Sequence, residues 1–242
     1  MLKGLQLIYM SNYQVKPKLG VIGGMGPEAT VLLMSRIIAL TEASDDCDHI
    51  PMLVDNNTQV PSRIKAIIEK TGDDPSNTLI TMAKELEGNG AKMLAMPCNT
   101  AHYYASTIQE AVNIPLLNMV TLTTEALSLK CVDNTIIGIL GSPALELTEI
   151  YDNAFSSHNF QAIYPENQQR MLNAIKLIKK NAASSEARQL FQDTAQQLVH
   201  GGAERVVIAC SEFSLISNCL SNVCPVIDSV DVLAQAVVDF AN

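Results

Sequence analysis

The chain has 242 residues, of which 48% are hydrophobic and 17% charged, and its formal net charge is -9. This composition is that of a globular protein with one large domain or two small ones, and the lack of a basic stripe excludes a typical nucleic-acid binder. No apolar run approaches the roughly 18 residues that a membrane span requires, so we expect no membrane partner. Residues 1–16 lack the features of a signal peptide and are interpreted as an N-terminal extension, with Met10 as an alternative start.

Short apolar segments alternate with longer amphipathic ones along the first half of the chain. Strands are expected at 18–22, 52–55 and 92–96, and helices at 28–41 and 78–88. The first strand ends in a glycine-rich turn, and the third ends at Cys98. Short strands separated by helices of this length are typical of a parallel sheet that is covered on both faces.

The second half of the chain repeats this scheme. A strand at 135–140 leads into a helix, and the segment 202–210 aligns with 90–98, so that each glycine precedes a cysteine by the same number of residues. After the cysteines, 113–117 matches 223–227. A generic α/β rhythm gives some of this agreement, but the repeated offsets favour duplication.

The fold class expected from this pattern is α/β, with two similar doubly wound, flavodoxin-like parallel-sheet domains. The first domain is expected to comprise residues 17–115 plus 226–242, because the last strand and helix return to it, and the second to comprise 116–225. Ligands of such sheets bind at the carboxyl ends of the strands. We therefore expect the active site in the cleft between the two domains.

Two cysteines follow buried strands at matched positions in the repeats. Cys98 precedes Asn99 and Thr100, and Cys210 precedes Ser211 and a glutamate. A thiol at a helix N-terminus feels the positive end of the helix dipole, which predicts a lowered pKa. A single cysteine here would be interpreted as a small hydrophobic core residue, but the matched pair favours a functional role.

The remaining cysteines predict no site of their own. Six cysteines without a C-x-x-C pair indicate neither a disulfide framework nor a zinc site, and a reducing cytoplasm fits this usage. Cys47 lies close to His49, but two ligands make a poor metal site, so no metal is expected.

Three separated segments carry a resemblance to a known family. They are Gly23-Gly24-Met25-Gly26-Pro27, Pro97-Cys98-Asn99-Thr100-Ala101-His102 and Ala209-Cys210-Ser211-Glu212. In this order they resemble the aspartate/glutamate racemase family, and its aspartate racemase branch most of all, over nearly the whole chain from about Lys16. The resemblance implies a cofactor-independent enzyme that uses two cysteines on opposite faces of the substrate α-carbon, and a homodimer.

The resemblance also implies which residues bind the substrate. Arg63 matches an arginine that binds a substrate carboxylate, with a solvated loop charge as the alternative. Lys179 matches a second substrate-binding cation, although Lys176 and Lys180 lie close by. The other expected substrate-binding residues are Met25, Gly26, Asn56, Asn99, Thr100, Ser142, Ser211 and Glu212.

Three further positions bear on the substrate and on proton transfer. Ser211 stands where relatives usually carry threonine, and it keeps the hydroxyl. Glu212 stands where glutamate racemases of the family tend to carry histidine, so it favours aspartate as substrate. His102 is a candidate general base, but a helix histidine more often caps or packs, and we expect that role here.

The expected function is racemisation of an acidic amino acid, aspartate, by proton transfer between Cys98 and Cys210. One cysteine, as thiolate, removes the α-proton while the other, as thiol, delivers a proton to the opposite face, and donors on the carboxylate stabilise the carbanion. The alternatives are a glutamate, broad-specificity or hydantoin racemase, a dicarboxylate isomerase, or a non-catalytic two-lobed binding protein. The glycine-rich turn matches no nucleotide fingerprint and no pyridoxal phosphate cup is evident, so no cofactor is expected.

Overall fold

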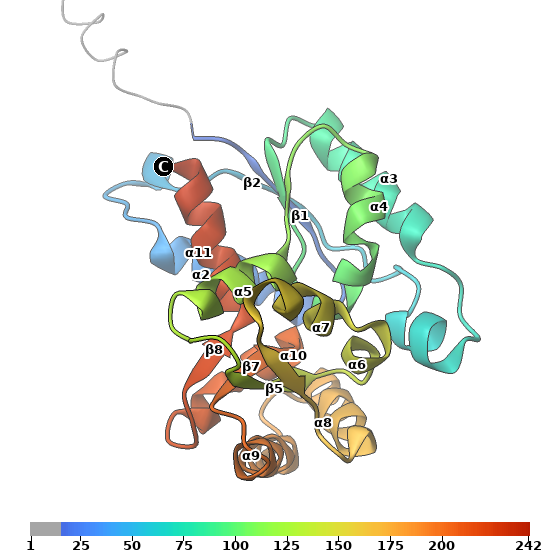
Figure 1. Cartoon of the computed structure of the whole chain (residues 1–242). Coiled ribbons are helices and arrows are strands. Elements are labelled where there is room, and N and C mark those ends of the chain that lie inside the picture. Colours follow the sequence, from blue (N-terminus) through green and yellow to red (C-terminus); the bar gives the residue numbers. More distant parts are fainter. Residues whose placement is uncertain (1–15) are drawn as a thin grey trace, which may run out of the picture.

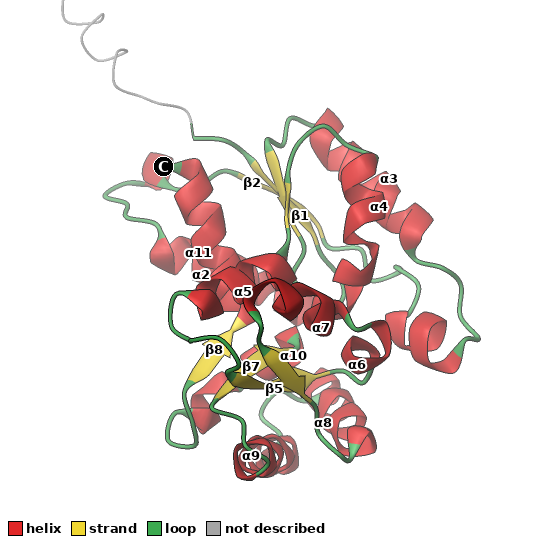
Figure 2. Cartoon of the chain, in the orientation of Figure 1, coloured by secondary structure: helices red, strands yellow, loops and turns green. Residues whose placement is uncertain are grey.

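The structure, a computed structural model, describes residues 16–242. Within these residues the chain forms two parallel four-stranded sheets, each flanked by helices (Figures 1 and 2). The expected N-terminal extension, 1–16, lies outside the described residues except for Lys16. None of the helices within 16–242 is long and apolar enough to cross a membrane.

The first sheet has the strand order β2-β1-β3-β4. Its strands are β1 (Leu19–Ile22), β2 (Met52–Asp55), β3 (Met93–Ala95) and β4 (Leu116–Leu117). The helices of this half are α2 (Pro27–Leu40), α3 (Ser76–Gly88), α4 (Ala105–Glu110) and α5 (Met119–Ser128), with short helical turns η1 (Asp46–Asp48), η2 (Ile64–Glu69) and η3 (Asn99–Tyr104). The central strand β1 is fully buried, which explains its continuous apolar sequence.

The second sheet repeats this order as β6-β5-β7-β8. Its strands are β5 (Ile136–Gly141), β6 (Gln161–Ile163), β7 (Arg205–Ala209) and β8 (Val226–Asp228). The remaining helices are α6 (Ala144–Thr148), α7 (Ile150–Phe155), α8 (Gln168–Lys180), α9 (Ser185–His200), α10 (Ser211–Ser214) and α11 (Ser229–Ala241), with turns η4 (Ser156–His158) and η5 (Ser217–Leu220). The expected α/β class with two doubly wound sheets is therefore correct.

Glycines at equivalent positions show that the two halves have the same local architecture. Gly20 in β1 lies against Leu86 and Ala91, and Gly138 in β5 lies against Leu198 and Ala203 in the same arrangement. A Cβ at either glycine would lie 3.0–3.1 Å from these side chains, tighter than an ordinary contact. The turns that lead into β3 and β7 each contain a glycine with positive φ, 93° at position 90 and 102° at position 202. That backbone conformation favours glycine over all other residues.

The fourth strand of each half is followed by a helix that covers the sheet of the other half. Asn118 caps α5, whose buried residues Val120 and Leu127 pack against the core of the second sheet. Asp228 caps α11, whose buried face packs with strands β1 and β3 of the first sheet. Figure 1 shows the consequence, since α11 lies beside α2 near the start of the described chain.

The fourth strands, and not the exchanged helices, depart from the expected domain boundaries. Residue 226 was expected to begin the return to the first domain, but β8 pairs with β7 in the second sheet. Similarly, β4 at 116–117 pairs with β3 in the first sheet, although the first domain was expected to end at 115. The crossing thus occurs at the helix caps Asn118 and Asp228, because strand pairing holds each fourth strand in its own sheet.

Candidate active site

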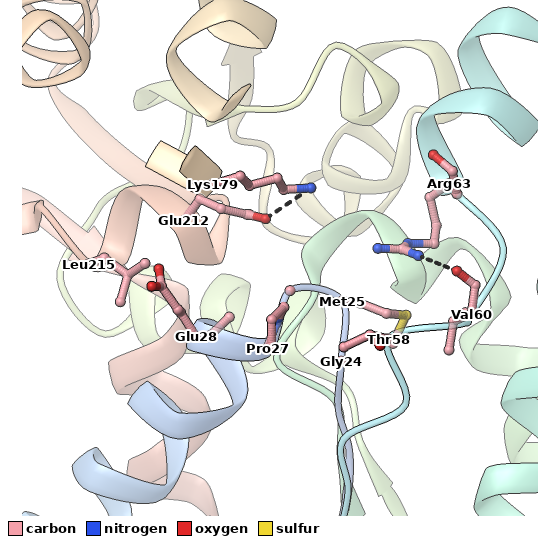
Figure 3. Close-up of a pocket in the computed structure, with 13 residues that line it drawn as sticks. Gly24, Met25, Pro27, Glu28, Thr58, Val60, Arg63, Lys179, Glu212 and Leu215 are labelled. Atoms are coloured by element: carbon pink, nitrogen blue, oxygen red, sulfur yellow. Dashed lines mark hydrogen bonds and ion pairs between the residues drawn. The ribbon is translucent and has the colours of Figure 1, made fainter. Parts of the chain in front are cut away.

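A cavity of about 410 Å³ opens between the two halves at the carboxyl ends of the strands (Figure 3). The first half contributes the turn after β1, the loop after β2 and the start of α2, and the second half contributes the end of α8 and the segment around α10. The lining residues are Gly24, Met25, Gly26, Pro27, Glu28, Ala29, Thr58, Val60, Ser62, Arg63, Lys179, Glu212 and Leu215. Its volume lies near the lower end of the range of small-molecule sites, about 300–1,000 Å³.

The floor of the cavity is the glycine-rich turn that joins β1 to α2. Gly24 has a φ of 89°, and a Cβ there would lie 2.2 Å from the carbonyl oxygen of Asn57, so only glycine fits. Its backbone N–H donates to Thr30 Oγ1 at 2.9 Å, which ties the turn to the helix. Gly26 is the N-cap of α2 and Pro27 is its first residue. The amino end of a 14-residue helix therefore borders the cavity, a favourable place for a carboxylate.

Two cations reach into the cavity from opposite halves (Figure 3). Arg63 precedes η2, and its Nη1 donates to the carbonyls of Pro61 at 3.0 Å and Val60 at 3.4 Å. Its buried Nε has no hydrogen-bond partner among residues 16–242, so the anchored fork keeps donors for an anion. Lys179, in the last turn of α8, comes from the other side.

Glu212 connects this lysine to a cysteine. Its Oε1 lies 3.2 Å from Lys179 Nζ, and its Oε2 accepts a hydrogen bond from Cys210 Sγ at 3.1 Å. The carboxylate also lies over the glycine-rich turn, because a Cβ built on Gly26 would be 3.5 Å from Oε1. Glu212 is thus the lining residue through which the Cys210 thiol is linked to the cavity.

Burial and the neighbouring Glu212 carboxylate raise the pKa of the Cys210 thiol well above its ordinary value. This direction corrects the sequence prediction of a lowered pKa for this cysteine. The helix that follows, α10, has only four residues, so its dipole is weak, and the Glu212 backbone N–H and Lys179 offset only part of the increase. The neutral thiol is therefore the favoured form of Cys210, and it donates to the Glu212 carboxylate.

Cys98 occupies the equivalent place in the first half. It is the N-cap of η3 with φ −149° and ψ 102°, as Cys210 is the N-cap of α10 with φ −149° and ψ 121°. Both side chains are buried, with 8% and 7% of their surface exposed. Cys98 packs in the same core cluster as Met25 and Val60, which line the cavity.

His102 supports the Cys98 segment and is not placed as a base. Its Nδ1 lies 2.9 Å from the Cys98 carbonyl oxygen and its Nε2 accepts from the Met119 backbone N–H at 3.1 Å, so Nδ1 carries the proton and donates. Burial lowers the pKa of His102 to about 4, and the ring stays neutral at physiological pH. Both ring nitrogens are used within the protein, as the sequence prediction of a capping or packing role requires.

The family of this chain follows from comparison with known proteins. A profile of the Asp/Glu/hydantoin racemase family matches residues 22–237. The chain belongs to this family.

Relatives and solved structures agree with this assignment. The racemase chain is 25% identical to the broad specificity amino-acid racemase RacX of Bacillus subtilis over 224 residues, which are 91% of this chain and 96% of that protein. The aspartate racemase of Picrophilus torridus has 29% identity and a TM-score of 0.83, covering 93% of this chain and 94% of its own. A glutamate racemase of Bacillus anthracis, RacE1, shares the fold at 17% identity with a TM-score of 0.63, covering 93% and 80% of the two chains.

Of the site residues predicted from the sequence, the structure brings Met25, Gly26, Arg63, Lys179 and Glu212 to the cavity of this racemase. Lys176 and Lys180 are not among the lining residues, so geometry selects Lys179 from the three neighbouring lysines. Seven others lie outside the lining: the two buried cysteines, Cys98 and Cys210, and five polar residues, namely the exposed Asn56, the half-buried Thr100, and the buried Asn99, Ser142 and Ser211.

The buried polar side chains among these five are engaged within the protein. Asn99 bonds to Tyr151 and Ser229, and Ser211 donates to the Pro97 carbonyl. Ser142 Oγ accepts from the Ala144 backbone N–H at 3.3 Å. Their side chains therefore hold segments of the fold together, and their contact with substrate stays a prediction.

Sequence reasoning missed several lining residues. Ser62 and Val60 lie inside the same short segment as Arg63, and Glu28 follows the glycine-rich turn, so proximity to recognised motifs was an available signal. Thr58 and Leu215 carry no such signal, because the loop after β2 and the segment after α10 meet only in the folded chain.

Proposed function

We propose that this racemase interconverts the enantiomers of aspartate without a cofactor, by two-base proton transfer between Cys98 and Cys210. The observation that carries the proposal is the equivalence of the two thiols. Each cysteine is the N-cap residue of a short helix after the third strand of its half, and the two have nearly the same backbone angles. Inversion at a carbon needs a proton acceptor and a proton donor on opposite sides, and a duplicated fold supplies two matched groups.

The charges of the cavity support an acidic amino acid as substrate. Arg63 and Lys179 offer two cationic partners for two carboxylates, and Glu212 and Glu28 offer acceptors for an ammonium group. Arg63 suits the distal carboxylate because its planar fork makes paired hydrogen bonds. A carboxylate that binds Lys179 would compete with Glu212 for the lysine, and so would couple substrate binding to the environment of Cys210.

The protonation state of Cys210 sets the order of events. Because its pKa is raised, Cys210 holds its proton, and turnover that starts from this form uses Cys98 as the base. The Cys98 thiolate takes the α-proton from one face, and the Cα–H electron pair stays on the substrate as a carbanion delocalised into the carboxylate. The Cys210 S–H then transfers its proton to the opposite face of Cα. Cys98 ends as thiol and Cys210 as thiolate, which is the starting state for the other enantiomer.

A broad-specificity racemase is the second candidate. RacX, which matches 91% of this chain, carries that description, and the apolar Val60 and Leu215 line part of the cavity. Glutamate and hydantoins are further candidate substrates of the family.

A homodimer in the cytoplasm is part of the proposal. Light scattering of the purified protein tests whether it is a dimer.

The test is racemisation measured by chiral chromatography for both enantiomers of aspartate, glutamate, alanine and a hydantoin. Aspartate is expected to be turned over fastest, and Cys98→Ala and Cys210→Ala are each expected to abolish inversion. Cys131→Ala, which removes a partly buried thiol outside the cavity, is the matched control. Near-normal turnover in either catalytic variant would overturn the two-base proposal, and faster turnover of neutral amino acids would favour the broad-specificity function.

A further inference from the structure

Two hydrogen-bond routes connect the segment around Cys98 to the segment around Cys210. In the first, Ser211, the residue after Cys210, donates through its hydroxyl to the carbonyl of Pro97, the residue before Cys98, at 2.6 Å. This contact is buried and joins positions that are 114 residues apart in the chain. It fixes the start of α10 against the end of the β3 segment.

The second route begins at Asn99, the residue after Cys98. Its Nδ2 donates to Ser229 Oγ at 2.9 Å, and the Ser229 hydroxyl donates to the carbonyl of Ile208 at 2.8 Å. Ile208 lies in β7, two residues before Cys210. The residue after each cysteine is thus tied to the strand end that precedes the other, directly in one case and through Ser229 in the other.

Tyr151 completes the second route. Its hydroxyl donates to Asn99 Oδ1 at 2.7 Å, so both polar atoms of the Asn99 side chain have partners and its orientation is fixed. Tyr151 and Ser229 have no exposed surface, and Asn99 has 2%. Burial raises the pKa of the Tyr151 hydroxyl, which keeps it protonated as the donor. In such an environment each bond costs more to break than it would in water.

We infer that four residues are positioning residues, which keep the two catalytic thiols on opposite sides of the substrate α-carbon. They are Ser211, Asn99, Ser229 and Tyr151. This role rests on the two-cysteine function proposed above. The side chains of all four are hydrogen-bonded within the protein, so they act through the backbone of the cysteine segments. Two thiols on separate sheets must be placed together for inversion, whereas removal of the α-proton needs only one of them.

The ratio of inversion to hydrogen exchange therefore reports the placement of the two thiols, and a loss of folded protein would not change this ratio. In heavy water, a well-placed pair delivers deuterium mainly with inversion. A displaced pair removes and returns hydrogen on one face, so the remaining substrate gains deuterium without inverting. Displacement of reacting groups by about 1 Å costs on the order of a hundred-fold in rate, so the ratio of inversion to exchange should fall by about ten-fold or more.

The experiment uses Ser211→Ala and Tyr151→Phe, each of which removes one hydroxyl from one route. Ser211→Thr keeps the hydroxyl and serves as the conservative rescue, and Tyr164→Phe removes a tyrosine hydroxyl bond to Asp152 that belongs to neither route. Proton NMR follows loss of the α-proton and chiral chromatography follows inversion. We expect Ser211→Ala and Tyr151→Phe to lower kcat and the ratio of inversion to exchange. KM should stay within about two-fold of the wild-type value, because neither residue lines the cavity. Both control variants should keep the wild-type ratio of inversion to exchange.

Each other outcome argues against a specific claim. Equal losses of exchange and inversion in Ser211→Ala and Tyr151→Phe would mean fewer active molecules and would overturn the positioning role. Wild-type ratios in both variants would overturn it as well, while leaving the proposed function intact. A wild-type protein that neither exchanges nor inverts any amino acid would overturn the proposed function, and the positioning role with it.

Discussion

Cys210 donates a 3.1 Å hydrogen bond from Sγ to Oε2 of Glu212, a residue only two positions further along the chain. The same carboxylate pairs with Lys179 through its other oxygen. One side chain therefore touches both a thiol and a cation at the cavity. An anion beside a thiol disfavours the thiolate and a cation favours it, so Glu212 raises the pKa of Cys210 and Lys179 lowers it.

The first prediction concerns that titration. Glu212→Gln removes the anion and leaves Lys179 beside the thiol, so the pKa of Cys210 should fall, whereas Lys179→Met removes a cation and should raise it. The rate of Cys210 alkylation by iodoacetamide, followed by mass spectrometry across pH, measures both shifts. Alkylation of the partly buried Cys224, which lies outside the cavity, is the internal control. Shifts of the same sign in the two variants would contradict the assignment.

The second prediction concerns Arg63. Arg63→Gln removes a charged hydrogen-bond donor from the cavity, and such bonds contribute about 1.5–3 kcal/mol, so kcat/KM for aspartate should fall by about ten- to 150-fold. Turnover of alanine should change much less, because alanine has no distal carboxylate. Lys65→Gln, an exposed cation two residues away, should leave both substrates unaffected. An equal loss for aspartate and alanine would assign Arg63 to the α-carboxylate instead.

The third prediction separates a structural histidine from a general base. The folded pKa of His102, about 4, lies below the ordinary value of 6.5, so the stability it contributes is present above pH 6.5 and is lost as pH falls toward 4. The size of that loss is about 3 kcal/mol at 1.36 kcal/mol per pKa unit. His102→Gln should remove this contribution, so the slope of unfolding free energy against pH between about 4 and 6.5, measured by urea denaturation, should be more negative than in the wild type.

Activity supplies the control for His102. Gln keeps one donor and one acceptor at the end of its side chain, so His102→Gln should retain racemisation at pH 8, whereas His102→Ala leaves the Met119 backbone N–H without its partner and should destabilise the fold by about 2–4 kcal/mol. Loss of turnover in a stably folded His102→Gln variant would restore the histidine as a candidate base.

The fourth prediction concerns Asp228, which is buried at the start of α11. Burial raises its pKa to about 6, and Asp231 adds to the rise, while Ser214, the Val230 backbone N–H and Arg36 oppose it. Because the folded protein holds this proton more tightly than the unfolded chain, the contribution of Asp228 to stability falls by about 3 kcal/mol as pH rises from about 4 to 6, opposite in sign to the contribution of His102.

Asp228→Asn tests this assignment. Asparagine keeps an oxygen for the Ser214 hydroxyl and is a good helix cap, so the variant should fold, and the slope of its unfolding free energy against pH between about 4 and 6 should be more positive than in the wild type. Asp239→Asn, an exposed carboxylate on the same helix, should leave the pH dependence unchanged. An unaltered slope in Asp228→Asn would show that another group titrates there.

Local pattern was sufficient to predict the sheets and the cysteines. Alternating apolar and amphipathic segments predict strands and helices directly, and the β2 bounds 52–55 agree with the structure. Cys98 and Cys210 were identifiable because duplication repeats their distance from the turn glycines at 90 and 202. Arg63 and Lys179 were identified by resemblance, and their position at the cavity agrees with that expectation.

Contacts between distant segments could not be predicted in this way. Tyr151 and Ser229 meet Asn99 only because α7 and α11 pack beside the Cys98 segment, and no motif marks either residue. The raised pKa of Cys210 was missed for the same reason, since it depends on burial and on the rotamer of Glu212. The return of the last helix to the first half was expected from the sequence, but nothing in the sequence signalled that β4 and β8 pair within their own sheets.

The exchange of α5 and α11 has a consequence for synthesis on the ribosome. The core of the first sheet includes Val230, Leu233 and Val237 of α11, which are translated long after β1 and β3. The first half therefore carries an open apolar face throughout elongation, and it closes only when 229–241 have emerged from the exit tunnel. A nascent chain halted before residue 229 should engage chaperones and be cleaved readily by protease, whereas extension past 241 should protect both halves together.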